Sequence, residues 1–335
     1  MLFRSGKKGP ELISIAEARA NAFKVDWKAA VPPAPAFVGI KHLKNYDLAE
    51  IAAHIDWAPF FQTWDLAGLY PKILDDAVVG KEARKVLADA QEMLKKIIEG
   101  RWLQANGVFA IYPANSRGDD IEIYANEKRD SAQMIWHGLR QQNRKPTGNP
   151  NLCLADFVAP CDAGIKDYVG AFAVTAGLGV EKRVKAYEEK HDDYNAIMLK
   201  ALADRMAEAF AELLHKRVRR EMWAYAKDED LGNDDMIAEK YRGIRPAPGY
   251  PACLDHTEKP PLFDLLHATE LTGITLTESN AMHPPSSVSG HYFNHPESKY
   301  FAVGRLAKDQ VEDYAKRKGQ SVGETEKWLG PYLDY

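Results

Sequence analysis

The most regular pattern of apolar positions lies in the stretch 192–225. Apolar side chains recur there every three or four residues, as on one face of an α-helix: Ile197, Ala201, Leu202, Met206, Ala209, Phe210, Leu213, Leu214 and Val218. This spacing predicts a helix roughly 50 Å long, at about 1.5 Å per residue. A similar pattern over 81–98 predicts a second amphipathic helix, which ends at Gly100.

Other segments have the pattern of strands. GVFAIY (107–112) and DIEIY (120–124) are apolar or alternating runs, and the segment PANSRGD separates them, so we expect a hairpin with an irregular loop. Further strands are expected at 37–43, 168–175, 274–277 and 300–303. Shorter helices are expected at 13–23, 47–56, 234–240, 262–272 and 308–318. Because helices and strands do not alternate regularly, we predict an α+β fold with a mixed or antiparallel twisted sheet and flanking helices.

Composition narrows the classes of partner. The chain has 335 residues, 45% of them hydrophobic and 27% charged, which is typical of a folded protein with one large domain or two smaller ones. Its formal net charge of -4 gives no overall attraction to nucleic acid or anionic lipid, so neither is an expected partner. The uncharged run 168–180 is too short to cross a bilayer. Three cysteines without a C-x-x-C motif favour free thiols and a cytoplasmic location.

One pair of histidines has a spacing that metal ligands use. His291 and His295 are four residues apart, but Gly290 and Pro296 argue against the helix that would place them on one face. We therefore expect no metal site and interpret them as loop or strand-end histidines. A metal hydrolase that uses these two side chains with Asp255 is the alternative, and it predicts stoichiometric zinc or iron.

Three stretches have an unusual composition. The proline-rich segment 242–261 places Arg245 and Tyr250 in a loop that is irregular yet rigid, which suits a small ligand with a carboxylate; a purely structural crossover is the alternative. Segment 278–301 mixes small hydroxyl residues with aromatic ones and suits a flat ring system, or it is a long loop around the core. In IDWAPFFQTWDLAG, Asp56 precedes an aromatic cluster, a combination that can hold a cation.

Taken in order, the motifs of this chain resemble the C-terminal reactivation domain of cobalamin-dependent methionine synthase. The likeness runs from about residue 15 to the end, and it rests on ARANAFKVDW, IDWAPFFQTW, SRGDDIEIY, LADFVAP, GAFAVTAG, HDDYNAIMLKALADRMAEAFAELLH, GIRPAPGYPAC with DHTEK, SVSGHYF with HPESKYFAVG, and DQVEDYAKRKG. The sequence has no cobalamin-binding D-x-H-x-x-G motif, folate barrel or zinc-cysteine homocysteine module, so we do not expect this chain alone to make methionine.

The resemblance implies a function in methionine biosynthesis. A domain of this family binds S-adenosylmethionine and presents its methyl group to cob(II)alamin, which a partner module carries, while flavodoxin or a similar donor supplies one electron. This reductive methylation restores methylcobalamin, so the expected activity is that of one part of a methyltransferase. A module of the same ancestry that serves another cobalamin enzyme is the alternative.

The resemblance also implies the ligand residues. Family contacts to S-adenosylmethionine fall on Asp56, Arg245, Tyr300 and Phe301, and we assign Arg245 to the carboxylate and Asp56 to the ammonium group. Glu208, Glu239 and Tyr250 match further positions near the ligand or cobalamin. Because these residues span most of the chain, we expect a single large domain over 36–335, preceded by an N-terminal arm or linker over 1–35.

Overall fold

The computed structural model describes residues 11–335, so the first ten residues of the expected N-terminal arm lie outside it. Its centre is an antiparallel sheet with the order β4-β3-β2-β5-β8, and β1 also pairs with β2. These strands are β1 (Gly39–Leu43), β2 (Gln104–Arg117), β3 (Asp120–Tyr124), β4 (Ala132–Trp136), β5 (Asp167–Leu178) and β8 (Ser287–Tyr292). The expected α+β class with an antiparallel sheet is confirmed.

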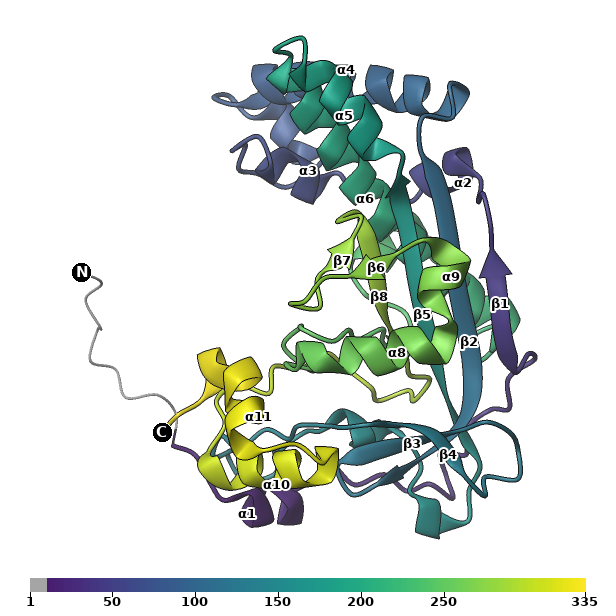
Figure 1. Cartoon of the computed structure of the whole chain (residues 1–335), viewed down its shortest axis with the longest axis vertical. Helices are drawn as coiled ribbons and strands as arrows, with labels where there is room; N and C mark the ends of the chain where they lie inside the picture. Colours follow the sequence, from purple (N-terminus) through teal and green to yellow (C-terminus); the bar gives the residue numbers. More distant parts are fainter. Residues whose placement is uncertain (1–10) are drawn as a thin grey trace.

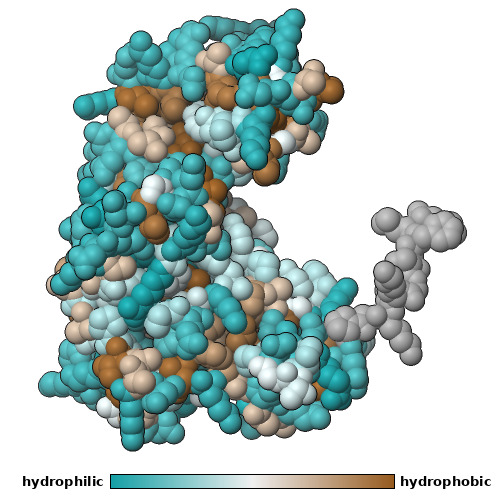
Figure 2. Space-filling view, turned by 180° about the vertical axis from the view of Figure 1, so that it is seen from behind, coloured by the Kyte–Doolittle hydropathy of each residue, from teal (hydrophilic) through white to brown (hydrophobic). Residues whose placement is uncertain are grey.

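The long strands β2 and β5 connect two ends of a C-shaped molecule (Figure 1). Short helices and the helices α4 (Gly80–Glu99) and α5 (Val180–Glu188) gather at one end, whereas β3, β4, α10 (Lys308–Lys318) and α11 (Val322–Leu329) lie at the other. The space-filling view from behind shows the same hollow side and a largely hydrophilic surface (Figure 2). None of the helices within residues 11–335 is long and apolar enough to cross a membrane.

The irregular loop that was predicted between the strands at 107–112 and 120–124 is wrong. Most of PANSRGD continues β2, which pairs with β3 from Ala114 to Arg117. Asn115 and Ser116 look like loop residues in the sequence, but their side chains donate hydrogen bonds to the carbonyl groups of Ala159 and Val158. Since these buried polar groups find partners, the strand extends through positions that local pattern assigns to a turn.

The long helix α6 (Asp193–Arg217) is shorter than its apolar pattern predicts. A wider π-helical turn follows at Val218–Met222. This turn brings Arg219 into the interior, where its guanidinium lies 2.8 Å from a carboxylate oxygen of Glu229 and 4.3 Å from the centre of the Tyr241 ring. The predicted end of the helix at Tyr225 is therefore wrong, because tertiary contacts of Arg219 replace the regular helical pattern.

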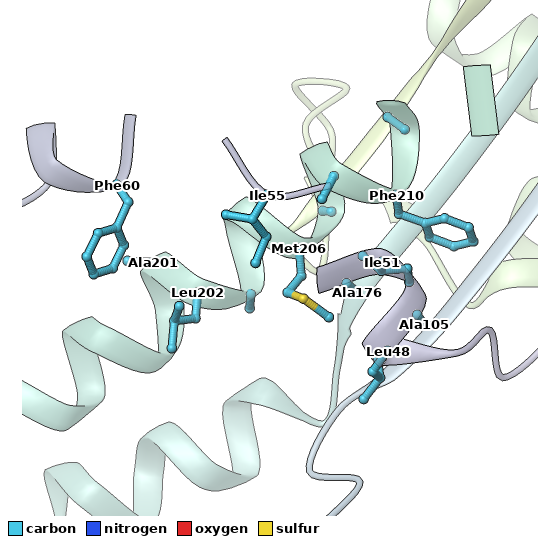
Figure 3. Close-up of a cluster of buried hydrophobic side chains, with 14 of the residues drawn as sticks. Leu48, Ile51, Ile55, Phe60, Ala105, Ala176, Ala201, Leu202, Met206 and Phe210 are labelled. Atoms are coloured by element: carbon cyan, nitrogen blue, oxygen red, sulfur yellow. The ribbon is translucent and has the colours of Figure 1, made fainter. Parts of the chain in front are cut away.

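One face of α6 packs on the segment that contains α2 (Leu48–Ala52) and α3 (Ala58–Gln62) (Figure 3). The buried side chains that meet there are Leu48, Ile51, Ile55, Phe60, Ala105, Ala176, Ala201, Leu202, Met206 and Phe210. Ile55 and Phe60 flank Asp56 in the sequence, and both are buried. Their burial fixes the position of the backbone that carries Asp56.

Two further expectations are wrong. The expected single helix over 262–272 is two helices, α8 (Lys259–Leu266) and α9 (Ala268–Thr272), because His267 between them has a φ of +49°, which no α-helix can include. The segment 300–303 is a loop instead of a strand, and the backbone N–H of Val303 donates to the carbonyl of Pro251 at 2.8 Å. A small two-stranded sheet pairs β6 (Thr275–Leu276) with β7 (Met282–His283), and the remaining helices are α1 (Ile15–Ala20) and α7 (Asn233–Ile237).

Buried charges connect α10 to the end of the proline-rich segment. The ammonium group of Lys318 lies 2.6 Å from carboxylate oxygens of both Asp255 and Glu258, and its side chain is only 8% exposed. The Tyr314 hydroxyl donates to Asp255 at 2.8 Å. Arg19, which lies within the expected N-terminal arm, forms an ion pair with Asp313, so the same helix also holds part of this arm. All three cysteines, Cys153, Cys161 and Cys253, are free thiols.

Candidate binding site

The proline-rich loop 242–251 lies against the end of β8. Two backbone hydrogen bonds, of 3.0 and 3.2 Å, join Ile244 to Phe293. Gly290 on β8 allows the loop to come close, because a Cβ atom at this position would lie 2.6 Å from the carbonyl oxygen of Pro246. The contacts of this loop therefore depend on a strand that the sequence pattern alone does not predict.

Arg245 is the best-connected side chain of the loop. Its Nη1 donates to Oε2 of Glu212 at 2.6 Å and to the Tyr241 hydroxyl at 3.2 Å. Its backbone N–H donates to the hydroxyl oxygen of Tyr300 at 2.9 Å. Burial by itself lowers the pKa of Arg245, but the Glu212 carboxylate, together with Tyr241 and Tyr300, outweighs this effect and raises the pKa above the ordinary value. The guanidinium is thus a fixed positive charge at a defined position.

Two adjoining cavities meet at Arg245. The acidic cavity, of about 240 Å³, lies between α6 and the segment around α3 and is lined by His54, Asp56, Pro59, Arg205, Glu208, Ala209, Glu212, Met236, Ile237, Glu239, Tyr241 and Arg245. The apolar cavity, of about 470 Å³, is lined by Phe172, Glu208, Glu239, Arg245, Pro246, Ala247, Tyr250, Pro251, Ala252, Val288, Tyr300 and Phe301. Glu208, Glu239 and Arg245 belong to both, so the two cavities form one continuous site.

The structure brings all of the ligand residues expected from the sequence into this site. Asp56 lines only the acidic cavity, whereas Tyr250, Tyr300 and Phe301 line only the apolar cavity. The chain segments that carry them are the α2–α3 connection, α6, the residues that follow α7, the proline-rich loop and the loop after β8. These segments are far apart in the sequence, and the sheet together with α6 places them side by side.

Two residues of the site, Glu212 and Tyr241, are not among those expected from the sequence. Glu212 follows Glu208 by one helical turn, so the i, i+4 spacing places both carboxylates on the same face of α6. That spacing was a usable signal in the sequence. The structure adds the reason why Glu212 needs a partner, because this acidic residue is only 9% exposed. Tyr241 carried no such signal, since its contact with Arg245 depends on the conformation of the loop.

The acidic cavity favours a positively charged ligand. It holds four carboxyl groups and two guanidinium groups, a formal excess of two negative charges when all are ionised. Burial raises the pKa of Glu208, and the nearby Arg245 partly offsets this effect. Burial also raises the pKa values of Tyr250 and Tyr300, so both phenols are neutral near pH 7. The site therefore joins an acidic region to a neutral aromatic one, with one guanidinium between them.

The histidines considered as metal ligands lie in aromatic surroundings. His291 is in β8, is fully buried and stacks on Trp136 with ring centres 3.9 Å apart. His295 is also buried and lies against Trp27. Asp255 instead binds Lys318. Within residues 11–335, no group of three or more His, Cys, Asp or Glu side chains is placed to hold a metal ion.

Comparisons with known proteins agree with this architecture. A sequence profile described as vitamin B12 dependent methionine synthase, activation domain, matches residues 47–319. A solved structure described as the MetH reactivation domain bound to AdoHcy is 53% identical in sequence, and the alignment covers 97% of this chain and 99% of that one, with a TM-score of 0.94. The profile spans most of this sequence, and the related structure has the same fold over nearly its whole length. The chain therefore belongs to the family of activation domains of vitamin B12-dependent methionine synthase.

Proposed function

We propose that this chain binds S-adenosylmethionine across the two cavities and presents its methyl group to cob(II)alamin carried by a partner module. The observation that carries the proposal is the position of Arg245 between an acidic and an apolar aromatic cavity. The related reactivation domain was crystallised with AdoHcy, which is S-adenosylmethionine without the methyl group.

The residues present fit the three parts of this ligand. The apolar cavity, with the Tyr300 and Phe301 rings, suits adenine and ribose. Arg245 suits the carboxylate, because a guanidinium can bind it through two parallel hydrogen bonds. Asp56 in the acidic cavity suits the ammonium group of the methionyl end. The order of cavities thus matches the order of groups along the ligand.

The charges of the site suit a sulfonium ligand. When bound, S-adenosylmethionine supplies a methyl group on a positively charged sulfur. Glu208 lies at the junction of the cavities, where its carboxylate can attract that charge, and Glu239 lies at the same junction. The same groups give less attraction to the neutral thioether of AdoHcy, so the site should release the demethylated product more easily.

The apolar cavity also has a side that a partner can reach. Tyr250 and Tyr300 line it while remaining 57% and 39% exposed. We infer that the cobalamin module of methionine synthase docks over these rings, and that flavodoxin or a similar donor supplies the electron for reductive methylation. The function is then to restore methylcobalamin for methionine biosynthesis, with Tyr250 next to the place where the methyl group leaves the site.

Two measurements test this function. Isothermal titration calorimetry with S-adenosylmethionine should give saturable binding with one ligand per chain. The chain, the matching cobalamin module, a one-electron reductant and methyl-labelled S-adenosylmethionine should then yield labelled methylcobalamin. Absence of binding would contradict the whole proposal. Binding without label transfer would contradict the reactivation step and favour a module that holds the ligand for another cobalamin enzyme.

A further inference from the structure

Glu212 forms the ion pair with Arg245 but has no role in the function proposed above. We propose that Glu212 is a positioning residue, which holds one edge of the Arg245 guanidinium so that the opposite edge is set to bind the ligand's carboxylate. This inference rests on the proposed binding of S-adenosylmethionine. It makes Glu212 part of the recognition of the ligand without direct contact between the two.

The hydrogen bonds of Arg245 support this division of the guanidinium. Nη1 carries two protons, and it donates one bond to Glu212 and one to Tyr241. Both hydrogen bonds that the Arg245 side chain makes within residues 11–335 start at this atom. Nε and Nη2 lie on the opposite edge, and their N–H groups form the parallel pair that a carboxylate can bind.

Glu212 is well placed to hold the guanidinium still. It lies on α6, whose opposite face is packed in the core with Met206 and Phe210 (Figure 3). Its side chain is 12% exposed and that of Arg245 is 20% exposed, so water screens the pair only weakly. An arginine side chain is long and flexible, and one that is held in place before the ligand arrives loses less rotamer freedom when the ligand binds. The pair therefore favours binding through the carboxylate even though the two charges offset each other.

The geometry also allows a second role for Glu212. Its other oxygen, Oε1, is buried and has no hydrogen-bond partner among the described residues, and the side chain lines the acidic cavity. This oxygen could bind the ligand's ammonium group directly. The two roles differ in which part of the ligand they recognise, so a ligand without a carboxylate separates them.

The test compares two ligands by calorimetry. The first is S-adenosylmethionine, and the second is its decarboxylated analogue, which keeps the adenosine, the sulfonium and a terminal amine. Glu212→Ala should weaken the binding of S-adenosylmethionine about tenfold, the effect of losing a charged hydrogen bond, and leave the analogue within about twofold of the unaltered chain. Arg245→Ala is the control that should show the same dependence on the carboxylate.

Two conservative variants separate positioning from charge and from folding. Glu212→Gln keeps an oxygen that accepts from Nη1, and it should restore most of the affinity for S-adenosylmethionine. Glu212→Asp keeps the negative charge but has a side chain one methylene group shorter, so the carboxylate lies farther from Arg245. This variant should lose affinity for S-adenosylmethionine and keep its affinity for the decarboxylated analogue. These variants carry the test if Glu212→Ala does not fold, which circular dichroism and thermal unfolding will reveal.

The possible results have distinct meanings. Equal losses for both ligands, or a Glu212→Gln variant as weak as Glu212→Asp, would overturn the inference and leave the proposed function intact. An unaltered chain that binds neither ligand would overturn both. If the unaltered chain binds both ligands equally, Arg245 does not bind the ligand's carboxylate. The positioning role of Glu212 would then be overturned as well.

Discussion

The hydroxyl oxygen of Tyr300 accepts a hydrogen bond from the backbone N–H of Arg245 at 2.9 Å, across 55 positions of the sequence. The bond joins the loop after β8 to the proline-rich loop, and the Tyr300 ring lines the apolar cavity at the same time. One side chain thus supports the loop that carries the guanidinium and forms a wall for the proposed nucleoside. The conformation of the proline-rich loop and the wall of the apolar cavity are coupled through this contact.

Replacing Tyr300 with Phe separates these two roles, because the ring stays and the hydrogen bond is lost. We expect the unfolding free energy to fall by about 1 kcal/mol and the affinity for S-adenosylmethionine to fall about fivefold. Urea unfolding and calorimetry measure the two effects. Tyr335→Phe, at an exposed tyrosine near the C-terminus, is the control and should leave the affinity unchanged. An unaltered affinity in Tyr300→Phe would mean that the bond does not position the loop.

Replacing Arg245 with Ala removes the proposed partner of the carboxylate. The binding of S-adenosylmethionine should weaken by about 1.5 to 3 kcal/mol, since charged hydrogen bonds are lost. Stability should also fall, because Glu212 loses its partner while it stays buried. Arg220→Ala, at an exposed arginine that lines neither cavity, is the control. Calorimetry that gives the same affinity in Arg245→Ala would show that the carboxylate binds elsewhere.

Replacing Lys318 with Met tests the buried charges under α10. The variant leaves Asp255 and Glu258 close together without their shared cation. We expect the unfolding free energy to drop by about 3 to 5 kcal/mol, as for other buried ion pairs that lose one partner. Lys316→Met, at an exposed position of the same helix, should change it by less than about 0.5 kcal/mol. If chemical denaturation gives the same change in unfolding free energy for Lys318→Met and Lys316→Met, the ion pairs of Lys318 do not stabilise the folded protein.

The stability of the protein should fall in acid partly because of His291. Burial lowers the pKa of this histidine from 6.5 to about 3. Between these pH values the unfolded chain binds a proton at His291 that the folded protein does not bind. The stability that the neutral His291 contributes is therefore lost progressively as the pH falls from 6.5 towards 3. The loss is about 1.4 kcal/mol per pH unit at most.

The His291→Phe variant removes the titrating group and keeps an aromatic ring against Trp136. Its unfolding free energy, measured by urea denaturation at a series of pH values, should decline less steeply in acid than that of the unaltered chain. His42→Phe, at an exposed histidine in β1, should not alter the slope. Equal slopes for His291→Phe and the unaltered chain would contradict the burial of a neutral imidazole.

Local pattern predicted the elements whose burial follows a simple period. The helix α4 was expected from apolar positions that repeat at helical spacing, and the structure has it within one residue of the predicted bounds. The helix α10 was expected at 308–318, and the structure has it at these bounds. Local pattern failed where distant contacts decide the conformation. β8 looks like a polar loop in the sequence, but it pairs with β5 because β5 presents an unpaired edge to it. The helix break at His267 also has no clear local signal.

The sequence by itself determined the class of the fold, the family resemblance and the identity of seven expected ligand residues, because these depend on periodic burial and on motifs in a fixed order. Only the tertiary structure decided that those residues surround one site and that Glu212 holds Arg245 across 33 positions. The physical reason is that an ion pair of this kind depends on how α6 lies on the sheet. That arrangement is set by the packing of the whole core, which a local pattern does not contain.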